Sequence, residues 1–349
     1  MERVDQRKWG IADCCVARKH FRTTKLDEID HFMDWKPFEK ILKKLVVRNA
    51  NAVGNPAYPA LIMFKCLLLQ RLYNLSDEAL EESLIDRISF LRFVGLGMED
   101  DIPDATTICR FRNSLLEKKV GEKLFKEFIA QLQRQGLSIS KGIAVDASVI
   151  QSARHPRKVF ENIPEDRDEP DLHTSSTEMQ EIKTVKVFSD DAEAAWIVKA
   201  GLASYGYKLN MASDVETGII LGGHMTPANH SDMNELPKIL EEIPIPKGTR
   251  CFADKGYTSA ANRTAVEEAG MKDGIMNKAV RGRKLTYWEQ LRNRLISSFR
   301  SGIERIFGNL KRNFRFQRSR YVGRMKVEQE FFFVAFAANL IRATKLAAR

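Results

Sequence analysis

Groups that usually bind zinc or form disulfides are scarce in this sequence. It contains five cysteines and six histidines among 349 residues. No two cysteines form a C-x-x-C pair, and the histidines lack the spacing of a zinc finger. The N-terminus also lacks the pattern of a secretory signal peptide. These absences argue against a zinc-finger protein or a secreted protein and favour the reducing cytoplasm.

Long apolar runs are absent as well. The longest one, FFFVAFAANLI at 331–341, is far shorter than the about 20 residues that a membrane-spanning helix needs. We therefore expect a buried helix here and no membrane partner.

Negative charge is scarce in one part of the chain. Residues 281–320 contain only two acids, Glu289 and Glu304, but twelve lysines and arginines. The difference of +10 equals the net charge of the whole chain. Such a basic segment raises the expectation of an anionic partner such as nucleic acid.

The first part of the chain is mostly helical in pattern. Residues 1–34 show little periodicity and are interpreted as an N-terminal arm. A helical domain is expected over 35–136, with the almost wholly apolar segment 59–73 as its central helix. Ser76 and Asp104 are expected to begin two further helices. The short connections fit either a DNA-binding helix-turn-helix or a helical bundle with a polar face, and the pattern alone favours neither.

The pattern changes to strands at about residue 137. KGIAVDASVI predicts a strand that ends near Asp146. YKLNMASD (207–214) alternates in polarity and predicts a half-buried strand, with GIILGGHMT as its hairpin partner. CFAD (251–254) predicts a short core strand. Strands followed by helices favour an α/β fold, a mixed sheet with helices packed on it.

A long helix from about 287 to 313 follows the strands. We assign 137–320 to one catalytic domain and 321–349 to a C-terminal helix. An insert at about 154–190 interrupts this domain, and its central part, 161–181, has eight acids and one arginine. A segment of this composition does not bury enough apolar surface to order itself. It is either a solvated linker or an acidic flap that masks a basic groove until DNA displaces it.

Three acidic residues stand out from this basic chain. Asp146 in GIAVDAS and Asp254 in CFADKGY each follow a short apolar run, and Glu304 lies in RSGIERIFGNLKR. At about 100° per residue, Glu304 shares one narrow stripe of its helix with Arg300 and Lys311. An Arg–Glu pair at i,i+4 can be an ordinary surface ion pair of ~0.3–0.5 kcal/mol. The two aspartates upstream favour a functional site instead.

Carboxylates in a basic setting point to a metal ion and a phosphodiester. Mg²⁺ prefers oxygen ligands, and a few carboxylates can hold two ions about 3.5–4 Å apart. Asp146 would contact both ions, Asp254 and Glu304 would each flank one, and Arg300 and Lys311 would hold phosphates. The other expected phosphate or DNA contacts are Lys255, Tyr257, Arg312, Arg315, Arg318 and Arg320.

The three acids, with Arg300-(3)-Glu304-(6)-Lys311, resemble the DDE transposases of bacterial insertion sequences. The similarity is greatest to the group named after the fifth insertion sequence, whose signature is Y-(2)-R-(3)-E-(6)-K. Ser297 stands at the tyrosine position, so the sequence departs from the signature there. The N-terminal helical segment and DAEAAWIVKAGLASYGYKLNMASD resemble the same family, so the resemblance covers nearly the whole chain.

The resemblance implies a ribonuclease-H-like catalytic core behind an N-terminal all-helical domain. It also implies Mg²⁺, or Mn²⁺ as a substitute, bound by Asp146, Asp254 and Glu304. The implied partners are double-stranded DNA, as transposon ends and target, and further copies of the chain in a homodimer or higher oligomer. The implied location is the bacterial cytoplasm, in association with the nucleoid.

The implied reaction is cleavage at terminal inverted repeats, followed by attack of the 3′-hydroxyl ends on target DNA. Two other functions remain as alternatives. One is a transposase-derived DNA-binding regulator that does not cut, and the other is a metal-dependent DNA nuclease that cuts but does not join.

Overall fold

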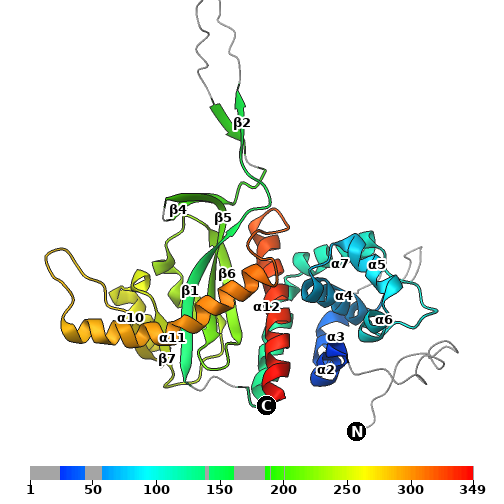
Figure 1. The fold of residues 1–349 in the computed structure, drawn as a ribbon, viewed down its shortest axis with the longest axis horizontal. Helices are drawn as coiled ribbons and strands as arrows, with labels where there is room; N and C mark the ends of the chain where they lie inside the picture. Colours follow the sequence, from blue (N-terminus) through cyan, green and yellow to red (C-terminus); the bar gives the residue numbers. More distant parts are fainter. Residues whose placement is uncertain are drawn as a thin grey trace, which may run out of the picture.

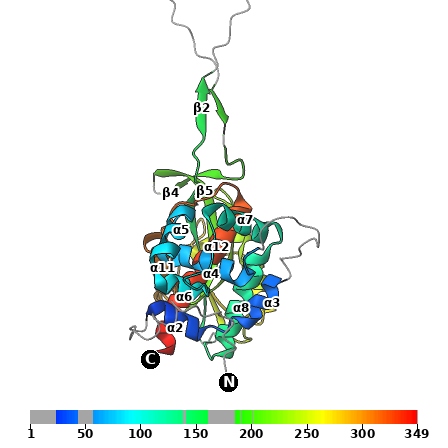
Figure 2. The same ribbon diagram turned by 90° about the vertical axis from the view of Figure 1, so that its right-hand side faces the viewer.

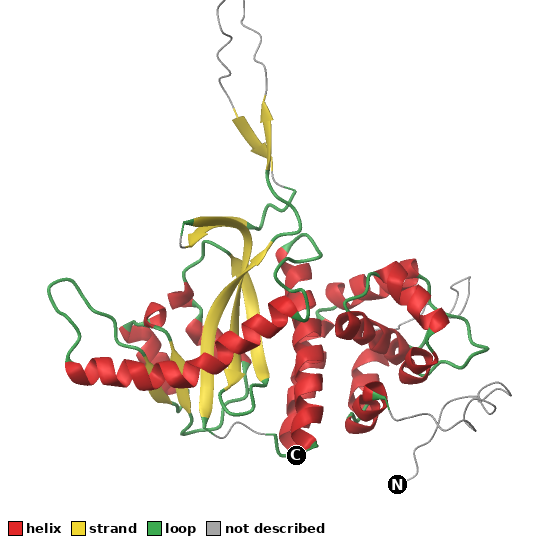
Figure 3. Cartoon of the chain, in the orientation of Figure 1, coloured by secondary structure: helices red, strands yellow, loops and turns green. Residues whose placement is uncertain are grey.

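A long C-terminal helix separates a helical domain from a mixed β-sheet (Figures 1 and 3). The computed structural model describes residues 24–43, 57–137, 141–160, 185–188, 190–199 and 201–348. The separating helix is α12 (Arg324–Ala347). Among the helices of these residues, α12 included, none carries enough apolar sequence to span a bilayer.

Seven helices of the described residues precede the sheet, and local signals explain where several begin. Ser76 Oγ accepts a hydrogen bond from the Ala79 backbone, and the Asp104 carboxylate accepts one from the Thr107 backbone, so both predicted caps are confirmed. The predicted central helix, α4, is buried along most of its length. The elements are α2 (Lys25–Phe32), α3 (Lys36–Lys43), α4 (Ala60–Tyr73), α5 (Asp77–Asp86), α6 (Ile88–Val94), α7 (Ala105–Glu117) and α8 (Val120–Arg134).

Helix α2 lies inside the segment expected to be an arm. Residues 1–23 lie outside the described part, but Thr24 begins α2 with a capping box that includes Asp27. Leu26, Ile29 and Met33 are all buried. Because their spacing places these three side chains on one face of the helix, they anchor the last third of the expected arm in the core.

The sheet has six strands, and its central strand is β1 (Gly142–Gln151). On one side β1 pairs with the antiparallel β5, and on the other with the parallel β7, which pairs in turn with β8. Strand β5 also pairs with β4 and β6, both antiparallel. This mixed sheet is the predicted ribonuclease-H-like core. The remaining strands are β4 (Ala195–Lys199), β5 (Leu202–Asp214), β6 (Ile220–Pro227), β7 (Arg250–Ala253) and β8 (Lys272–Ile275).

Helices cover the sheet on its two faces (Figure 1). The longest, α11 (Tyr287–Arg312), crosses one face against β1 and β7 and has almost the predicted bounds. Its start has a capping box formed by Thr286 and Glu289. The shorter connecting helices are η1 (Asp232–Asn234), α9 (Leu236–Glu242), η2 (Lys255–Tyr257) and α10 (Ala260–Glu268).

Two strand predictions were wrong in detail. Strand β1 does not end near Asp146 but continues to Gln151, because β5 pairs with it along nearly its whole length. Strand β5 is not half-buried: from Tyr205 to Asp214 every residue is buried, since the strand lies between neighbours and under helices. Two of its polar side chains find internal partners: Lys208 Nζ donates to the His230 carbonyl at 2.6 Å, and Asn210 Nδ2 donates to Thr226 Oγ1 at 3.1 Å.

The acidic insert begins and ends in a two-stranded hairpin. Strands β2 (Arg157–Phe160) and β3 (Val185–Phe188) pair antiparallel and project from the body of the molecule (Figures 1 and 2). The acidic stretch 161–181 lies outside the described residues, so the linker and flap interpretations both stay predictions.

The C-terminal helix packs against both the helical domain and the sheet. The predicted buried helix at 331–341 is confirmed as part of α12. The Phe336 ring lies 5.7 Å from Phe38, 5.5 Å from Phe64 and 4.1 Å from Phe128, on three different helices. On its other side α12 packs on β6, where Asn339 hydrogen-bonds the backbone N–H and carbonyl of Ile220.

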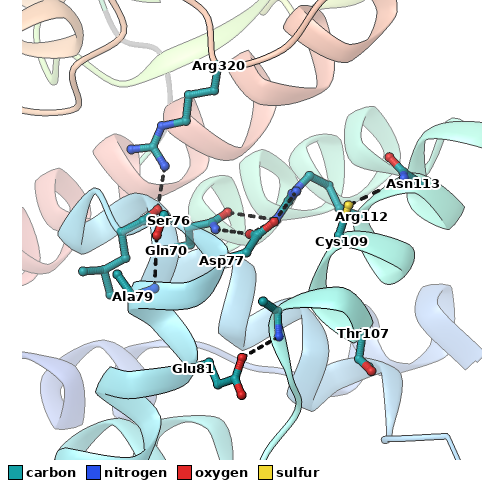
Figure 4. Close-up of polar contacts among 12 residues, drawn as sticks. Gln70, Ser76, Asp77, Ala79, Glu81, Thr107, Cys109, Arg112, Asn113 and Arg320 are labelled. Atoms are coloured by element: carbon teal, nitrogen blue, oxygen red, sulfur yellow. Dashed lines mark hydrogen bonds and ion pairs between the residues drawn. The ribbon is translucent and has the colours of Figure 1, made fainter.

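Buried charged groups tie α12 to the helical domain. Arg71 and Glu330 form an ion pair at 2.7 Å, with both side chains almost fully buried. Nearby, Arg112 pairs with Asp77 and also hydrogen-bonds Gln70 (Figure 4). Because every one of these charges has a partner inside the protein, the network fixes how the helices sit on α12.

Candidate active site

The two aspartates lie side by side at the centre of the sheet. Strands β1 and β7 run parallel, and their last paired residues are Val145 and Ala253. Asp146 is the next residue of β1, and Asp254 is the first residue after β7, so both carboxylates come at the point where β7 ends. Asp254 also caps η2, since its Oδ1 accepts a hydrogen bond from the Lys255 backbone at 2.6 Å.

Arg300 from α11 lies between these two carboxylates. Its Nη2 is 2.9 Å from Asp146 Oδ2, and its Nη1 is 3.6 Å from Asp254 Oδ1. The Arg300 side chain is only 9% exposed. Arg300 therefore does not form the ordinary surface ion pair with Glu304 that the sequence left open. It makes a buried contact with both aspartates instead.

Several electrostatic effects act on the pKa of the Asp146 carboxyl in opposite directions. Burial raises the pKa of the Asp146 carboxyl, and the negative charge of Asp254 raises it further. The positive charge of Arg300, the hydrogen bond from the Ala147 backbone and the charge of Lys199 act in the opposite direction. The net effect is a raised pKa for the Asp146 carboxyl.

The aspartate pair fits a divalent cation. Its oxygens are hard ligands of the kind Mg²⁺ prefers, and the guanidinium between them marks a place where positive charge is favourable. Glu304 lies one turn beyond Arg300 on α11 and is exposed. Within the described residues no three His, Cys, Asp or Glu side chains lie close enough to hold a metal ion. The structure thus brings two of the three predicted carboxylates together, and the third lies on the adjacent helix.

Two lysines, Lys199 and Lys311, lie near each other, and the charge of Lys199 reaches Asp146. Lys311 is partly buried, and burial, followed by the nearby positive charge of Lys199, lowers its pKa. The charge of Lys199 also acts on Asp146, so it faces the same region from the end of β4. The sequence identified Lys311 but not Lys199, because an exposed lysine at the end of an edge strand has no local signal of function.

The other predicted phosphate contacts are spread over different surroundings. Lys255 is exposed beside Asp254, whereas the Tyr257 side chain is buried with only 1% exposure and is closed off from a bound phosphate in this conformation. Arg312 borders an open depression on the outer side of α11, together with Glu304. Arg315 is exposed just beyond the helix.

Two arginines beyond α11 are engaged with backbone carbonyls. Arg318 donates to the carbonyls of Ser152 and Ala153, at 3.0 and 3.1 Å. Arg320 donates to the Leu75 carbonyl at 2.6 Å, in the contact with the helical domain (Figure 4). Both side chains therefore have a structural role in these contacts.

One more acid lies near the pair. Burial raises the pKa of the Tyr257 hydroxyl well above its usual value, and the charges of Asp232 and Asp146 add to this effect. Asp232 is therefore close to the site, where it forms an ion pair with Lys208 at 2.7 Å. His230, its neighbour in the sequence, pairs instead with Glu235 at 3.0 Å.

A mixed sheet that brings two carboxylates together from neighbouring parallel strands, followed by a helix that carries a third, defines a ribonuclease-H-like enzyme. Residues 138–340 match a family model described as a transposase DDE domain, and residues 14–114 match one described as a transposase domain. The chain belongs to the DDE transposase family. It is therefore an enzyme of DNA cleavage and strand transfer that depends on a divalent metal and has DNA as its partner.

Individual relatives were also found. The chain is 37% identical over 236 residues to the transposase for insertion sequence element IS1106 of Neisseria meningitidis serogroup B, covering 67% of this chain and 76% of that protein. Its fold was compared with a piggyBac transposase synaptic complex with hairpin DNA (TM-score 0.42, 12% identity, covering 91% of this chain and 74% of that chain). The Mos1 strand transfer complex gives a TM-score of 0.21 at 8% identity, covering 89% and 92%. These two structural likenesses are too low to support any argument about the site.

Proposed function

We propose that this transposase cuts phosphodiesters at terminal inverted repeats and joins the 3′-hydroxyl ends to target DNA by two-metal-ion catalysis. The observation that carries the proposal is the pair Asp146 and Asp254, held on adjacent parallel strands around a single buried guanidinium. Glu304 supplies the third carboxylate from α11. Magnesium or manganese bound there would activate the attacking oxygen and stabilise the leaving one.

The chain's own residues position the DNA. The sheet would hold the carboxylates of Asp146 and Asp254, the proposed metal ligands, in fixed positions. The reacting phosphate would therefore bind to a site of fixed geometry. Lys199 places positive charge near Asp146, and Lys311 lies near Lys199, so both would bind the phosphates that flank the cut.

The finer assignments rest on the sequence. The spacing Arg300-(3)-Glu304-(6)-Lys311 supports membership in the group named after the fifth insertion sequence. Joining two transposon ends requires that they be held together, which supports a homodimer or larger assembly on DNA. Such a protein would act at the nucleoid, in the cytoplasm.

The function is tested with labelled DNA ends and a supercoiled target. With Mg²⁺ or Mn²⁺ present, we expect cuts at the inverted repeat and joined products when pre-cleaved ends are supplied. Cleavage without joining would identify a nuclease. Binding without either reaction would identify a DNA-binding regulator.

Replacing Arg300 with glutamine is expected to destabilise the protein by about 1–3 kcal/mol without metal, because two neighbouring carboxylates lose their shared cation. This is less than the ~3–5 kcal/mol typical of a fully buried pair, since the Asp254 side chain is 39% exposed and screened by water. A divalent ion would then replace the lost charge, so it should stabilise the variant more than the wild type. Urea denaturation with and without Mn²⁺ measures both effects.

Arg305→Gln is the matched control, because Arg305 is an exposed residue of the same helix that borders the outer depression. It should leave both the stability and the effect of Mn²⁺ unchanged. Equal Mn²⁺ stabilisation of wild type and Arg300→Gln would show that the ion does not bind between the two aspartates.

A further inference from the structure

Two large aromatic side chains at the start of α11 are unusually exposed. Tyr287 is 71% exposed and Trp288 is 74% exposed. Their rings contact each other edge to face, with centroids 5.4 Å apart. Figure 1 shows that the first turns of α11 and the preceding loop extend beyond the sheet. The two rings together form a local aromatic surface that faces solvent.

The loop before this aromatic pair is basic. Residues 277–286, the basic loop, contain four positive side chains and no acid. One of them, Arg283, pairs with Glu289 at 2.6 Å. The others are exposed, as is Arg294 two turns into the helix. The positive residues of the loop are Lys278, Arg281, Arg283 and Lys284.

Charge distinguishes two possible occupants of this surface. In a two-fold contact between copies of the chain, the same basic loop would lie near its own copy, and like charges across an interface disfavour association. A nucleic acid brings the opposite charge in its phosphates and flat bases that stack on aromatic rings. Aromatic rings beside lysines and arginines are the combination found in single-strand binding sites.

We propose that the basic loop and the aromatic pair, Tyr287 and Trp288, form a second DNA-binding surface that grips an unpaired stretch of strand. The loop binds its phosphates and the rings stack on its bases. A paired base within a duplex has both faces covered by its neighbours, so these rings select unstacked bases. This inference rests on the proposed function for the identity of the partner as DNA and for the position of the cut.

The helix sets the distance between this surface and the carboxylates. Glu304 lies 16 residues after Trp288 on α11, about 24 Å at 1.5 Å per residue. At about 3.4 Å per nucleotide of a stacked strand, this corresponds to about seven nucleotides. The unpaired bases that stack here therefore lie about that far from the phosphate being cut.

The test compares a blunt duplex with the same duplex carrying an unpaired thymidine tail, by fluorescence anisotropy in EDTA so that no cutting occurs. Wild type should bind the tailed DNA more tightly. Tyr287→Ala/Trp288→Ala should lose about fivefold to a hundredfold in affinity for the tailed DNA, and little for the blunt duplex. Replacing Lys278, Arg281 and Lys284 with glutamine should instead make the affinity for the tailed DNA less sensitive to salt. The slope of log affinity against log salt concentration should become shallower by about two.

Trp196→Ala is the matched control, because Trp196 is 52% exposed on β4, away from the basic loop, and should leave the tail preference unchanged. Equal binding of tailed DNA by wild type and the double variant would overturn the inference but leave the proposed function standing. If the double variant lost self-association in sedimentation but still bound both DNAs like wild type, the inference would be overturned. The aromatic pair would then form an interface between copies of the chain. Failure of wild type to bind either DNA would contradict the proposed function itself.

Discussion

Asp146→Asn is expected to lower the rate of DNA cleavage by at least about a thousandfold. A metal ion supplies several kcal/mol of transition-state stabilisation in phosphoryl chemistry, and every ~1.4 kcal/mol is a factor of ten. Asparagine keeps the size of the side chain but removes the charge that faces both Arg300 and the proposed ions. Single-turnover cleavage of a labelled inverted-repeat end in Mg²⁺ measures the loss.

The folded state should tolerate this change. Burial raises the pKa of the Asp146 carboxyl because it penalises the charged form, and a neutral asparagine avoids that penalty. Arg300 keeps Asp254 as a partner. Unfolding in urea should therefore show little loss of stability, so that a drop in rate reports on catalysis.

Glu216→Gln controls for the loss of one negative charge. Glu216 forms an exposed ion pair with Lys141 at 2.8 Å, in the turn after β5. Its replacement should leave cleavage within about twofold of wild type, because exposed pairs contribute little. A folded Asp146→Asn variant that cut at the wild-type rate would remove Asp146 from the catalytic assignment.

Much of the fold is predictable because its boundaries are local. Ser76 and Asp104 mark helix starts through their own side chains, and the structure confirms both positions. The end of β1 was mispredicted because it depends on pairing partners. β7 leaves β1 at Val145, but β5 continues, and no property of the β1 residues records that difference.

The candidate site shows the same division. Strand ends indicated Asp146 and Asp254, and their adjacency follows from parallel pairing. Helical geometry placed Arg300 and Glu304 on one stripe, but it could not say which acid Arg300 would choose. That choice is tertiary, because the sheet under α11 presents two carboxylates to a guanidinium that has little access to water.

The position of the C-terminal helix was also beyond the sequence. The run of phenylalanines at 331–341 predicts burial, yet any apolar surface would satisfy it. Phe336 contacts rings on three helices that lie more than 200 residues earlier in the chain. Such long-range packing leaves no local pattern, so residues 321–349 could be predicted only as a separate C-terminal helix.

The same shared helix leads to the second large effect, that of Glu330→Ala. We expect a loss of about 3–5 kcal/mol in the free energy of unfolding, because Arg71 would remain buried and unpaired. Glu330 Oε2 also accepts a hydrogen bond from the Arg320 backbone at 3.0 Å, and that donor would lose its partner too. Urea denaturation measures the change.

A double variant separates the loss of the pair from the loss of one partner. Arg71→Met/Glu330→Leu replaces both charges with apolar groups, and it should recover much of the stability lost in Glu330→Ala. If the two variants were similarly unstable, the loss of the ion pair itself, and not the unpaired arginine, would cause the effect.

Because α12 packs on β6 as well as on α4 and α8, Glu330→Ala should lower the unfolding midpoints of the sheet and the helical domain together. Separate midpoints, with only the helical signal shifted, would show that α12 does not couple the two parts of the protein.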